Sequence, residues 1–150
     1  MIKYLANEYQ IVFSFLNIFN YITFRSGAAI LTALFFSLIF GEFIIQKLSK
    51  IQPSGQPIRK DGPESHIIQK AGTPTMGGLL IILSVLVSCL LWSDLKNNFV
   101  WIALITITSF GFIGFFDDYK KIKTNSTIGL SSRIRIIFQI FFSLIITYLI

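Results

Sequence analysis

The chain has 150 residues, of which 53% are apolar, 15% aromatic and only 13% charged, and its net charge is +6. A soluble domain carries about a quarter charged residues, and disordered chains are poor in aromatics and rich in charge. The composition excludes both classes and indicates a protein embedded in a lipid bilayer. The single cysteine, Cys89, excludes an internal disulfide framework and a cysteine-based metal cluster.

Spanning segments are the first elements to locate, because a helix needs about 20 apolar residues to cross a membrane. Residues 9–24 are interrupted by asparagines and rich in aromatics, which favours an interfacial helix over a span. Four nearly uncharged runs follow, at residues 26–46, 71–93, 97–116 and 136–150. The sequence therefore predicts an all-α, polytopic transmembrane helical bundle with about four spans, forming a single domain.

The basic residues predict the orientation of these spans. Ten of the thirteen lysines and arginines lie in residues 47–70 and 117–135, two loops that alternating spans place on one side. The positive-inside rule makes that side cytoplasmic and puts the N-terminus outside. In a membrane protein, clustered positive charge indicates how the spans are oriented, so we expect no nucleic-acid partner.

Two adjacent carboxylates, Asp117 and Asp118, follow the third run. A helix C-terminus disfavours negative charge, and adjacent carboxylates repel each other, so a positive group should offset them. Lys120 and Lys121 could do so at a solvated helix end, and so could a divalent cation. Two aspartates are too few for a closed site, but Mg²⁺ accepts few protein ligands when phosphates and water complete its shell.

The loop before the second run contains a possible anion site. Thr73 and Pro74 have the pattern of an N-cap followed by a first helical residue, with Lys70 just before and the Thr75 hydroxyl in the first turn. Helix N-termini attract anions. The plainer interpretation is a capped helix start with glycine packing at residues 77–78. His66, the only histidine, has either a structural role or a phosphate contact.

Both clusters are expected at the cytoplasmic interface, where an anionic phosphate and a cation would meet at the depth of lipid headgroups. That layout suits phosphoryl transfer onto a lipid phosphate. An ion channel or transporter is the rival class, but no charge lies near the middle of the last three runs. A non-catalytic membrane subunit, in which the aspartates merely end a helix, also remains open.

Three motifs resemble the phospho-N-acetylmuramoyl-pentapeptide-transferase family: Asp61-Gly-Pro-Glu-Ser-His66, Lys70-Ala-Gly-Thr-Pro-Thr-Met-Gly-Gly78 and Gly111-Phe-Ile-Gly-Phe-Phe-Asp-Asp-Tyr119. The resemblance implies a bacterial inner-membrane enzyme that moves phospho-N-acetylmuramoyl-pentapeptide from its UDP carrier to undecaprenyl phosphate, releases UMP and requires Mg²⁺. An N-acetylglucosamine-1-phosphate transferase of the same superfamily is the alternative. The resemblance also admits a homodimer.

Carried onto this sequence, the resemblance implies that Asp117 and Asp118 are the catalytic and metal-binding pair. It implies substrate binding by Lys70 and Thr75, and assigns His66 and Lys121 to substrate-binding loop positions. A direct reaction and a covalent phospho-aspartate route both remain open. Family members have about ten spans, so we expect this chain to be the N-terminal portion of the enzyme and inactive alone.

Overall fold

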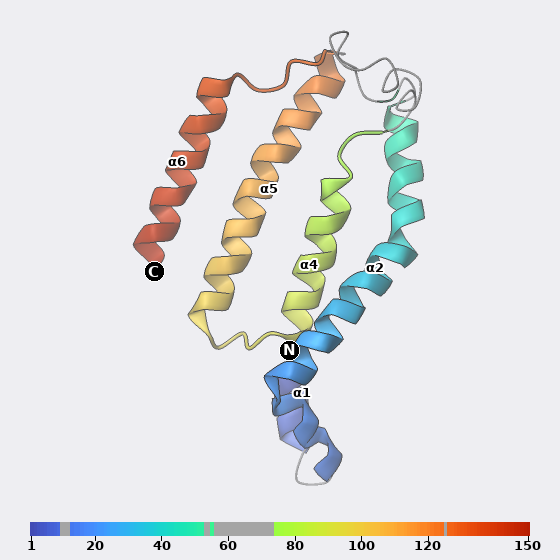
Figure 1. The fold of residues 1–150 in the computed structure, drawn as a ribbon, viewed down its shortest axis with the longest axis vertical. Coiled ribbons are helices and arrows are strands. Elements are labelled where there is room, and N and C mark those ends of the chain that lie inside the picture. Colours follow the sequence, from blue (N-terminus) through green and yellow to red (C-terminus); the bar gives the residue numbers. More distant parts are fainter. Residues whose placement is uncertain (10–12, 53–54, 56–73, 125) are drawn as a thin grey trace.

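The computed structural model describes residues 1–9, 13–52, 55, 74–124 and 126–150, and every regular element in them is helical. Figure 1 shows their arrangement. The elements are α1 (Ile2–Tyr9), the 3₁₀ helix η1 (Ser14–Asn20), α2 (Ile22–Ile51), α4 (Gly78–Trp92), α5 (Asn98–Thr124) and α6 (Ser132–Leu149). The prediction of an all-helical fold is confirmed.

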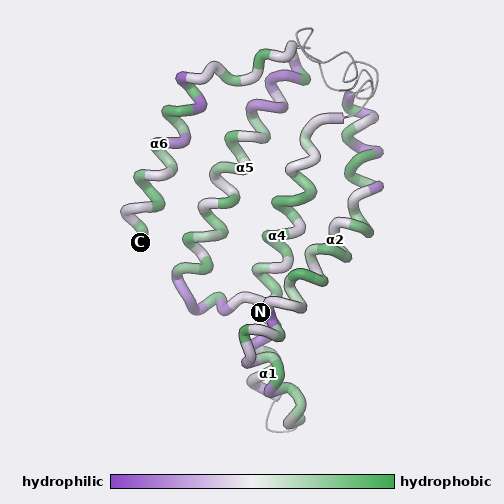
Figure 2. The backbone as a smooth tube through the Cα atoms, viewed as in Figure 1, coloured by the Kyte–Doolittle hydropathy of each residue, from purple (hydrophilic) through white to green (hydrophobic). Residues whose placement is uncertain are grey.

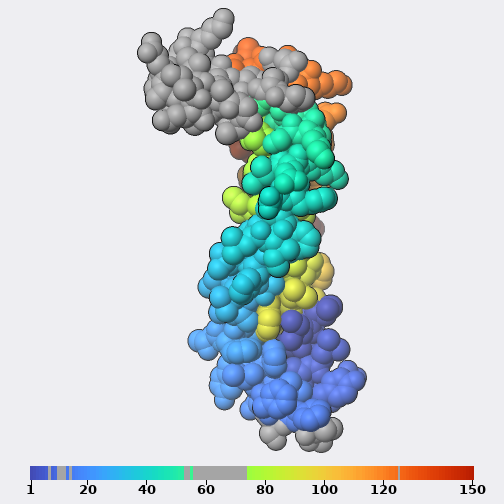
Figure 3. Space-filling view, turned by 90° about the vertical axis from the view of Figure 1, so that its right-hand side faces the viewer, coloured from blue at the N-terminus to red at the C-terminus, as the bar shows by residue number. Residues whose placement is uncertain are grey.

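The four longer helices lie side by side in a single layer, in the order α2, α4, α5, α6, and successive helices run in opposite directions (Figure 1). Each packs against its neighbours in this order. Seen along the layer, with α2 in front, the molecule is a narrow column (Figure 3). The C-termini of α2 and α5 therefore meet the N-termini of α4 and α6 at one end, which we call the Asp117 end. We call the other the Asp94 end, after the residue between α4 and α5.

Three helices, α2, α5 and α6, are long and apolar enough to cross a membrane, and α4 is a shorter apolar helix. Hydrophobic residues line these helices, and hydrophilic residues gather toward the ends of the layer (Figure 2). Large apolar side chains such as Ile30, Leu38 and Phe141 are mostly exposed. Lipid can solvate such side chains, so this outward-facing apolar surface is the pattern expected of membrane helices.

Small polar residues, and not only large apolar ones, lie at the contacts between the helices. Ser84 and Ser88 of α4 and Ser109 of α5 are among the buried residues. The two α4 serines donate hydrogen bonds to carbonyls one turn earlier, at 2.8 Å and 2.7 Å, so burial leaves neither hydroxyl unsatisfied. Small side chains let helix backbones approach closely, which is how helices associate in lipid.

The helix bounds differ from the apolar runs at the Asp117 end. Helix α5 continues eight residues past residue 116, so Asp117 and Asp118 lie within it and not at its end. Helix α4 begins at Gly78, although the sequence suggested a start at Pro74. Pro74 and Thr75 precede the helix, and Met76 adopts a left-handed backbone conformation with φ of 74°, which cannot continue a right-handed helix. The proposed cap, Thr73, lies outside the described residues.

The N-terminal segment packs at the Asp94 end. Within residues 9–24, the structure shows η1 and then the start of α2 after Tyr21. Phe19 of η1 stacks on Trp92, with ring centroids 5.9 Å apart, and the Trp92 indole N–H donates to the Thr32 hydroxyl at 2.9 Å. Aromatic side chains of this kind favour the membrane interface, and an interfacial location for this segment stays a prediction.

Candidate functional site

Among the residues that the structure describes, Asp117 is the most enclosed charged residue, with 7% of its surface exposed. One carboxylate oxygen accepts hydrogen bonds from the Leu130 backbone N–H at 2.8 Å and from the Arg135 guanidinium at 2.7 Å. The other oxygen lies 2.6 Å from the Lys121 ammonium. Asp117 thus ties α5 to the start of α6, and two cations offset its charge.

Asp118 is in a different environment, with 29% of its side chain exposed. It pairs with Lys121 at 3.1 Å and accepts a hydrogen bond from the Thr75 hydroxyl at 3.1 Å. Lys121 lies one turn after both aspartates and contacts both, which explains how adjacent carboxylates coexist near the negative end of a helix. The sequence indicated Lys120 and Lys121 as compensating cations, and the structure shows Lys121 in that position.

Thr75 reaches Asp118 because α2 holds the segment that precedes α4. Gln52, the residue that caps the C-terminus of α2, is 4% exposed. Its side-chain oxygen accepts the Thr75 backbone N–H at 2.9 Å. Four parts of the chain therefore contribute to one polar network: the C-cap of α2, the segment before α4, α5 and α6. The network runs from Gln52 through Thr75, Asp118, Lys121 and Asp117 to Arg135.

Gly129, just before α6, allows the chain to pass close to Asp117. A Cβ atom at this position would overlap the Asp117 carboxylate. The absence of a side chain lets the next residue, Leu130, donate its backbone N–H to that carboxylate. Glycine is thus required here by close approach of the backbone to a buried charge.

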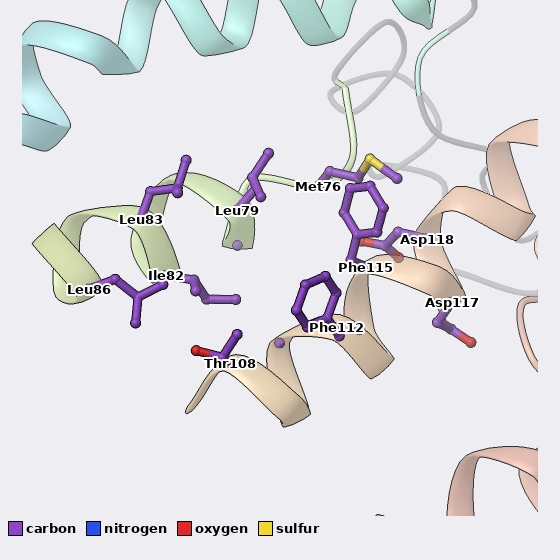
Figure 4. A pocket seen from close by; sticks show the side chains of 13 residues that line it. Met76, Leu79, Ile82, Leu83, Leu86, Thr108, Phe112, Phe115, Asp117 and Asp118 are labelled. Atoms are coloured by element: carbon purple, nitrogen blue, oxygen red, sulfur yellow. The ribbon is translucent and has the colours of Figure 1, made fainter. Parts of the chain in front are cut away.

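A cavity of about 460 Å³ adjoins the two aspartates and extends between α4 and α5. Figure 4 shows Leu79, Ile82 and Leu86 of α4 on one side and Phe112 and Phe115 of α5 on the other. In this view Asp118 lies next to Phe115, one turn earlier on α5, whereas the Asp117 carboxylate points away from the apolar side chains. The site thus joins an apolar cavity to a compensated charge cluster, which suits an amphiphilic ligand with a charged head.

Four of the six residues singled out from the sequence come together: Thr75, Asp117, Asp118 and Lys121. Lys70 and His66 lie outside the described residues. Sequence reasoning missed Gln52 and Gly129, and counted Arg135 only as a topology-determining charge. A glycine before a helix and a glutamine after one carry no distinctive signal. Arg135 could have been suspected as a partner, since two carboxylates need more than one cation.

The side chains around Asp117 and Asp118 provide only some of the ligands that a magnesium ion needs. Within the described residues, no group of three or more histidine, cysteine, aspartate or glutamate side chains could hold a metal. Asp117 already accepts from three donors. The Asp118 carboxylate is the more exposed of the two, and a carboxylate oxygen is a ligand that Mg²⁺ accepts together with water and phosphate oxygens. Asp118 therefore fits a site with few protein ligands, and Asp117 fits a supporting position beside it.

The fold and site define a membrane-embedded helical protein with an acidic pair beside an apolar cavity, and known proteins are similar to it in sequence. Residues 70–82, which include Thr75 and Met76, match the pattern described as phospho-N-acetylmuramoyl-pentapeptide-transferase signature 1. Proteins named phospho-N-acetylmuramoyl-pentapeptide-transferase are 53% identical over 122 residues in Gluconobacter oxydans and 55% identical over 121 residues in Gluconacetobacter diazotrophicus. Each alignment covers 81% of this chain.

A third relative of the same name, from Granulibacter bethesdensis, is 48% identical over 145 residues, or 97% of this chain. The chain belongs to the phospho-N-acetylmuramoyl-pentapeptide-transferase family. The alignments cover 34%, 33% and 40% of these three relatives, so the chain corresponds to little more than a third of their length.

Proposed function

We propose that this chain forms part of a membrane enzyme that transfers phospho-N-acetylmuramoyl-pentapeptide from its UDP carrier to undecaprenyl phosphate. One observation carries the proposal: Thr75, within the matched signature, donates a hydrogen bond to Asp118 beside the cavity between α4 and α5. The signature and the acidic pair come from separate parts of the sequence, and the fold brings them into one network.

In the proposed reaction, an oxygen of the lipid phosphate attacks the phosphorus next to the sugar, and the bond from that phosphorus to UMP breaks. Asp118, at the cavity, is the group placed to orient the lipid phosphate or take its proton. Lys121 offers N–H donors to phosphate oxygens, Thr75 orients Asp118 through its hydroxyl, and Asp117 holds Lys121 and Arg135 in position. The family resemblance adds Lys70 and His66 as proposed substrate-binding residues.

Magnesium is the proposed cofactor, with Asp117 and Asp118 as its acidic pair and Asp118 as the direct ligand. When bound, the ion would offset the negative charge on the phosphates. Because Asp118 is already paired with Lys121, we expect metal binding to compete with that ion pair. One N–H of Lys121 would then be available to a phosphate oxygen, while Asp117 still holds the ammonium.

We also propose that the enzyme lies in the bacterial inner membrane with the Asp117 end facing the cytoplasm, because the C-termini of α2 and α5, which lead into the two lysine- and arginine-rich stretches of the sequence, lie at that end. Cysteines introduced at Ser54 and Asn125, in a Cys89→Ala background, should resist an impermeant maleimide in intact cells. Labelling of either from outside would overturn this orientation. The exposed apolar helix faces leave room for a second copy, and a homodimer is part of the proposal.

A chimera tests the activity, since the chain spans only a part of its relatives. The chain replaces the aligned segment of the Gluconobacter oxydans protein, and the purified chimera receives radiolabelled UDP-N-acetylmuramoyl-pentapeptide and undecaprenyl phosphate. We expect a radiolabelled, lipid-extractable product and release of UMP. The same relative without the aligned segment is the control. A folded chimera that makes no lipid-linked product, beside an active parent enzyme, would contradict the proposal.

A further inference from the structure

We infer that Gln52 is a positioning residue, which clamps the backbone of Thr75 and so holds the Thr75 hydroxyl against Asp118. The clamp itself is a property of the fold, and its effect on the reaction rests on the proposed function. Nothing in the sequence marks Gln52, which follows an apolar helix and belongs to none of the recognised motifs.

The contact uses both ends of the Gln52 amide group. The side-chain oxygen accepts the Thr75 N–H at 2.9 Å, and the side-chain nitrogen lies 3.5 Å from the Thr75 carbonyl oxygen, to which it donates. The two residues are 23 positions apart. An N–H needs an acceptor and a carbonyl needs a donor, so this pairing allows only one orientation of the amide. Gln52 is buried, so water does not readily replace it.

Thr75 depends on this contact because its own segment is not helical. Pro74 has no backbone N–H to donate, Met76 has a left-handed backbone, and α4 begins only at Gly78. The Thr75 N–H and carbonyl are thus outside the regular hydrogen bonds of a helix. Gln52 satisfies both groups, which fixes the backbone from which the Thr75 hydroxyl reaches Asp118. The end of α2 thereby sets the position of a hydroxyl donor to a carboxylate on α5.

The clamp predicts a specific change in amide exchange. Gln52→Met keeps a similar length and apolar stem but removes both hydrogen bonds. In the detergent-solubilised chain, the Thr75 amide should exchange with deuterium about tenfold faster in this variant, as expected when a buried hydrogen bond is lost. Gln46→Met is the matched control, because Gln46 lies on the exposed surface near the end of α2 and donates a hydrogen bond to Glu42 of the same helix, at 3.3 Å. Unchanged Thr75 exchange in Gln52→Met would overturn the clamp.

The positioning role is tested by a double-mutant cycle in the chimera. Gln52→Met should lower kcat about tenfold, the loss expected from one disturbed hydrogen bond to a charged group. Thr75→Val removes the hydroxyl, and in that background Gln52→Met should have no further effect on kcat. Two contacting residues that act through one group are non-additive. Additive effects would show that Gln52 acts on general stability, and would contradict positioning through Thr75.

The outcomes separate this inference from the proposed function. If the unmodified chimera is inactive, the proposed function fails, and the exchange measurement still decides whether Gln52 clamps Thr75. If the chimera is active and Gln52→Met behaves like Gln46→Met in kcat and in exchange, the function stands and the positioning role is refuted.

Discussion

The two ends of the helical layer each hold an aspartate paired with lysine near the C-terminus of a helix, yet they are built differently. Asp94 follows α4, and its carboxylate accepts hydrogen bonds from Lys3 and Tyr4 of α1. Asp118 lies in the last turns of α5 and pairs with Lys121. The two aspartate side chains are nearly equally exposed, at 31% and 29%.

At the Asp94 end, positively charged groups donate hydrogen bonds to the last carbonyl groups of α4. The Met1 ammonium donates to the Leu90 and Leu91 carbonyl oxygens, and Arg25 donates to the Trp92 carbonyl at 3.4 Å. Cations at the negative end of a helix are stabilising. The Asp94 carboxylate then neutralises part of this positive charge and docks α1. These hydrogen bonds give the charged groups of the Asp94 end a structural role.

At the Asp117 end, four parts of the chain contribute to one network, and a cavity adjoins it. Asp117 and Asp118 lie within α5, which continues to Thr124, so they do not serve to complete the end of that helix. The comparison teaches that an aspartate–lysine pair does not by itself indicate a reactive site. The convergence of several segments beside a cavity distinguishes the Asp117 end from the Asp94 end.

The largest expected difference between the two ends is in the reaction rate. Asp118→Asn keeps the shape of the side chain but removes its charge and basicity, so the chimera should lose about 10²- to 10⁴-fold in initial rate. Asp94→Asn makes the same chemical change at an equally exposed aspartate and should leave the rate unchanged. Rates are compared at equal amounts of folded protein. Equal losses in both variants would break the distinction between the ends.

The next largest expected effect is a loss of folding stability when Gly129 is substituted. Gly129→Ala places a methyl group where the Asp117 carboxylate lies, so that carboxylate must move away from its donors. Overpacking of this kind costs about 1–3 kcal/mol, which should lower the midpoint of thermal unfolding in detergent. Gly27→Ala is the control, because a Cβ there meets no atom within 4 Å and alanine favours a helix. An unchanged midpoint for Gly129→Ala would argue against tight packing around Asp117.

The smallest expected effect is the pH dependence of the contact between Asp94 and α1. Hydrogen bonds from Lys3 and Tyr4 hold the pKa of the Asp94 carboxyl well below its usual range. A lowered pKa in the folded state means that the carboxylate stabilises α1 docking fully above the ordinary carboxyl pKa, and that this stabilisation is lost as pH falls through the lowered value.

The Lys96 backbone N–H reports this transition, since it donates to Asp94 at 3.3 Å and to the Tyr4 hydroxyl at 3.1 Å. Its amide NMR shift should stay constant through the ordinary titration range of aspartate and change only at lower pH. Lys3→Met should move the midpoint upward. A midpoint at the ordinary aspartate value in the unmodified chain would contradict the docking contact.

The sequence predicted the helical class and singled out the acidic pair, because both depend on local composition: apolar runs long enough to span a bilayer, and two adjacent carboxylates directly after one of these runs. The expectation that the pair ends the helix was wrong, because α5 continues to Thr124. It could not predict the network around them. Leu130 and Arg135 reach Asp117 across 13 and 18 positions, and Gln52 reaches Thr75 across 23. These contacts arise only when helices pack. The start of α4 at Gly78 and not at Pro74 follows the left-handed backbone of Met76, which the sequence does not mark.

The central claim is that the Asp117 end is the reactive end of the molecule. The magnesium dependence of the initial rate tests this claim most directly. The chimera, its Asp117→Asn variant and its Asp118→Asn variant are compared over a range of Mg²⁺ concentrations at matched yield of folded protein. We predict a large rate loss in both, a need for more Mg²⁺ in Asp118→Asn, and a lower unfolding midpoint in Asp117→Asn, which loses charge beside Lys121 and Arg135. Near-normal rates with unshifted Mg²⁺ dependence in both variants would contradict the claim and leave the two aspartates a purely structural role.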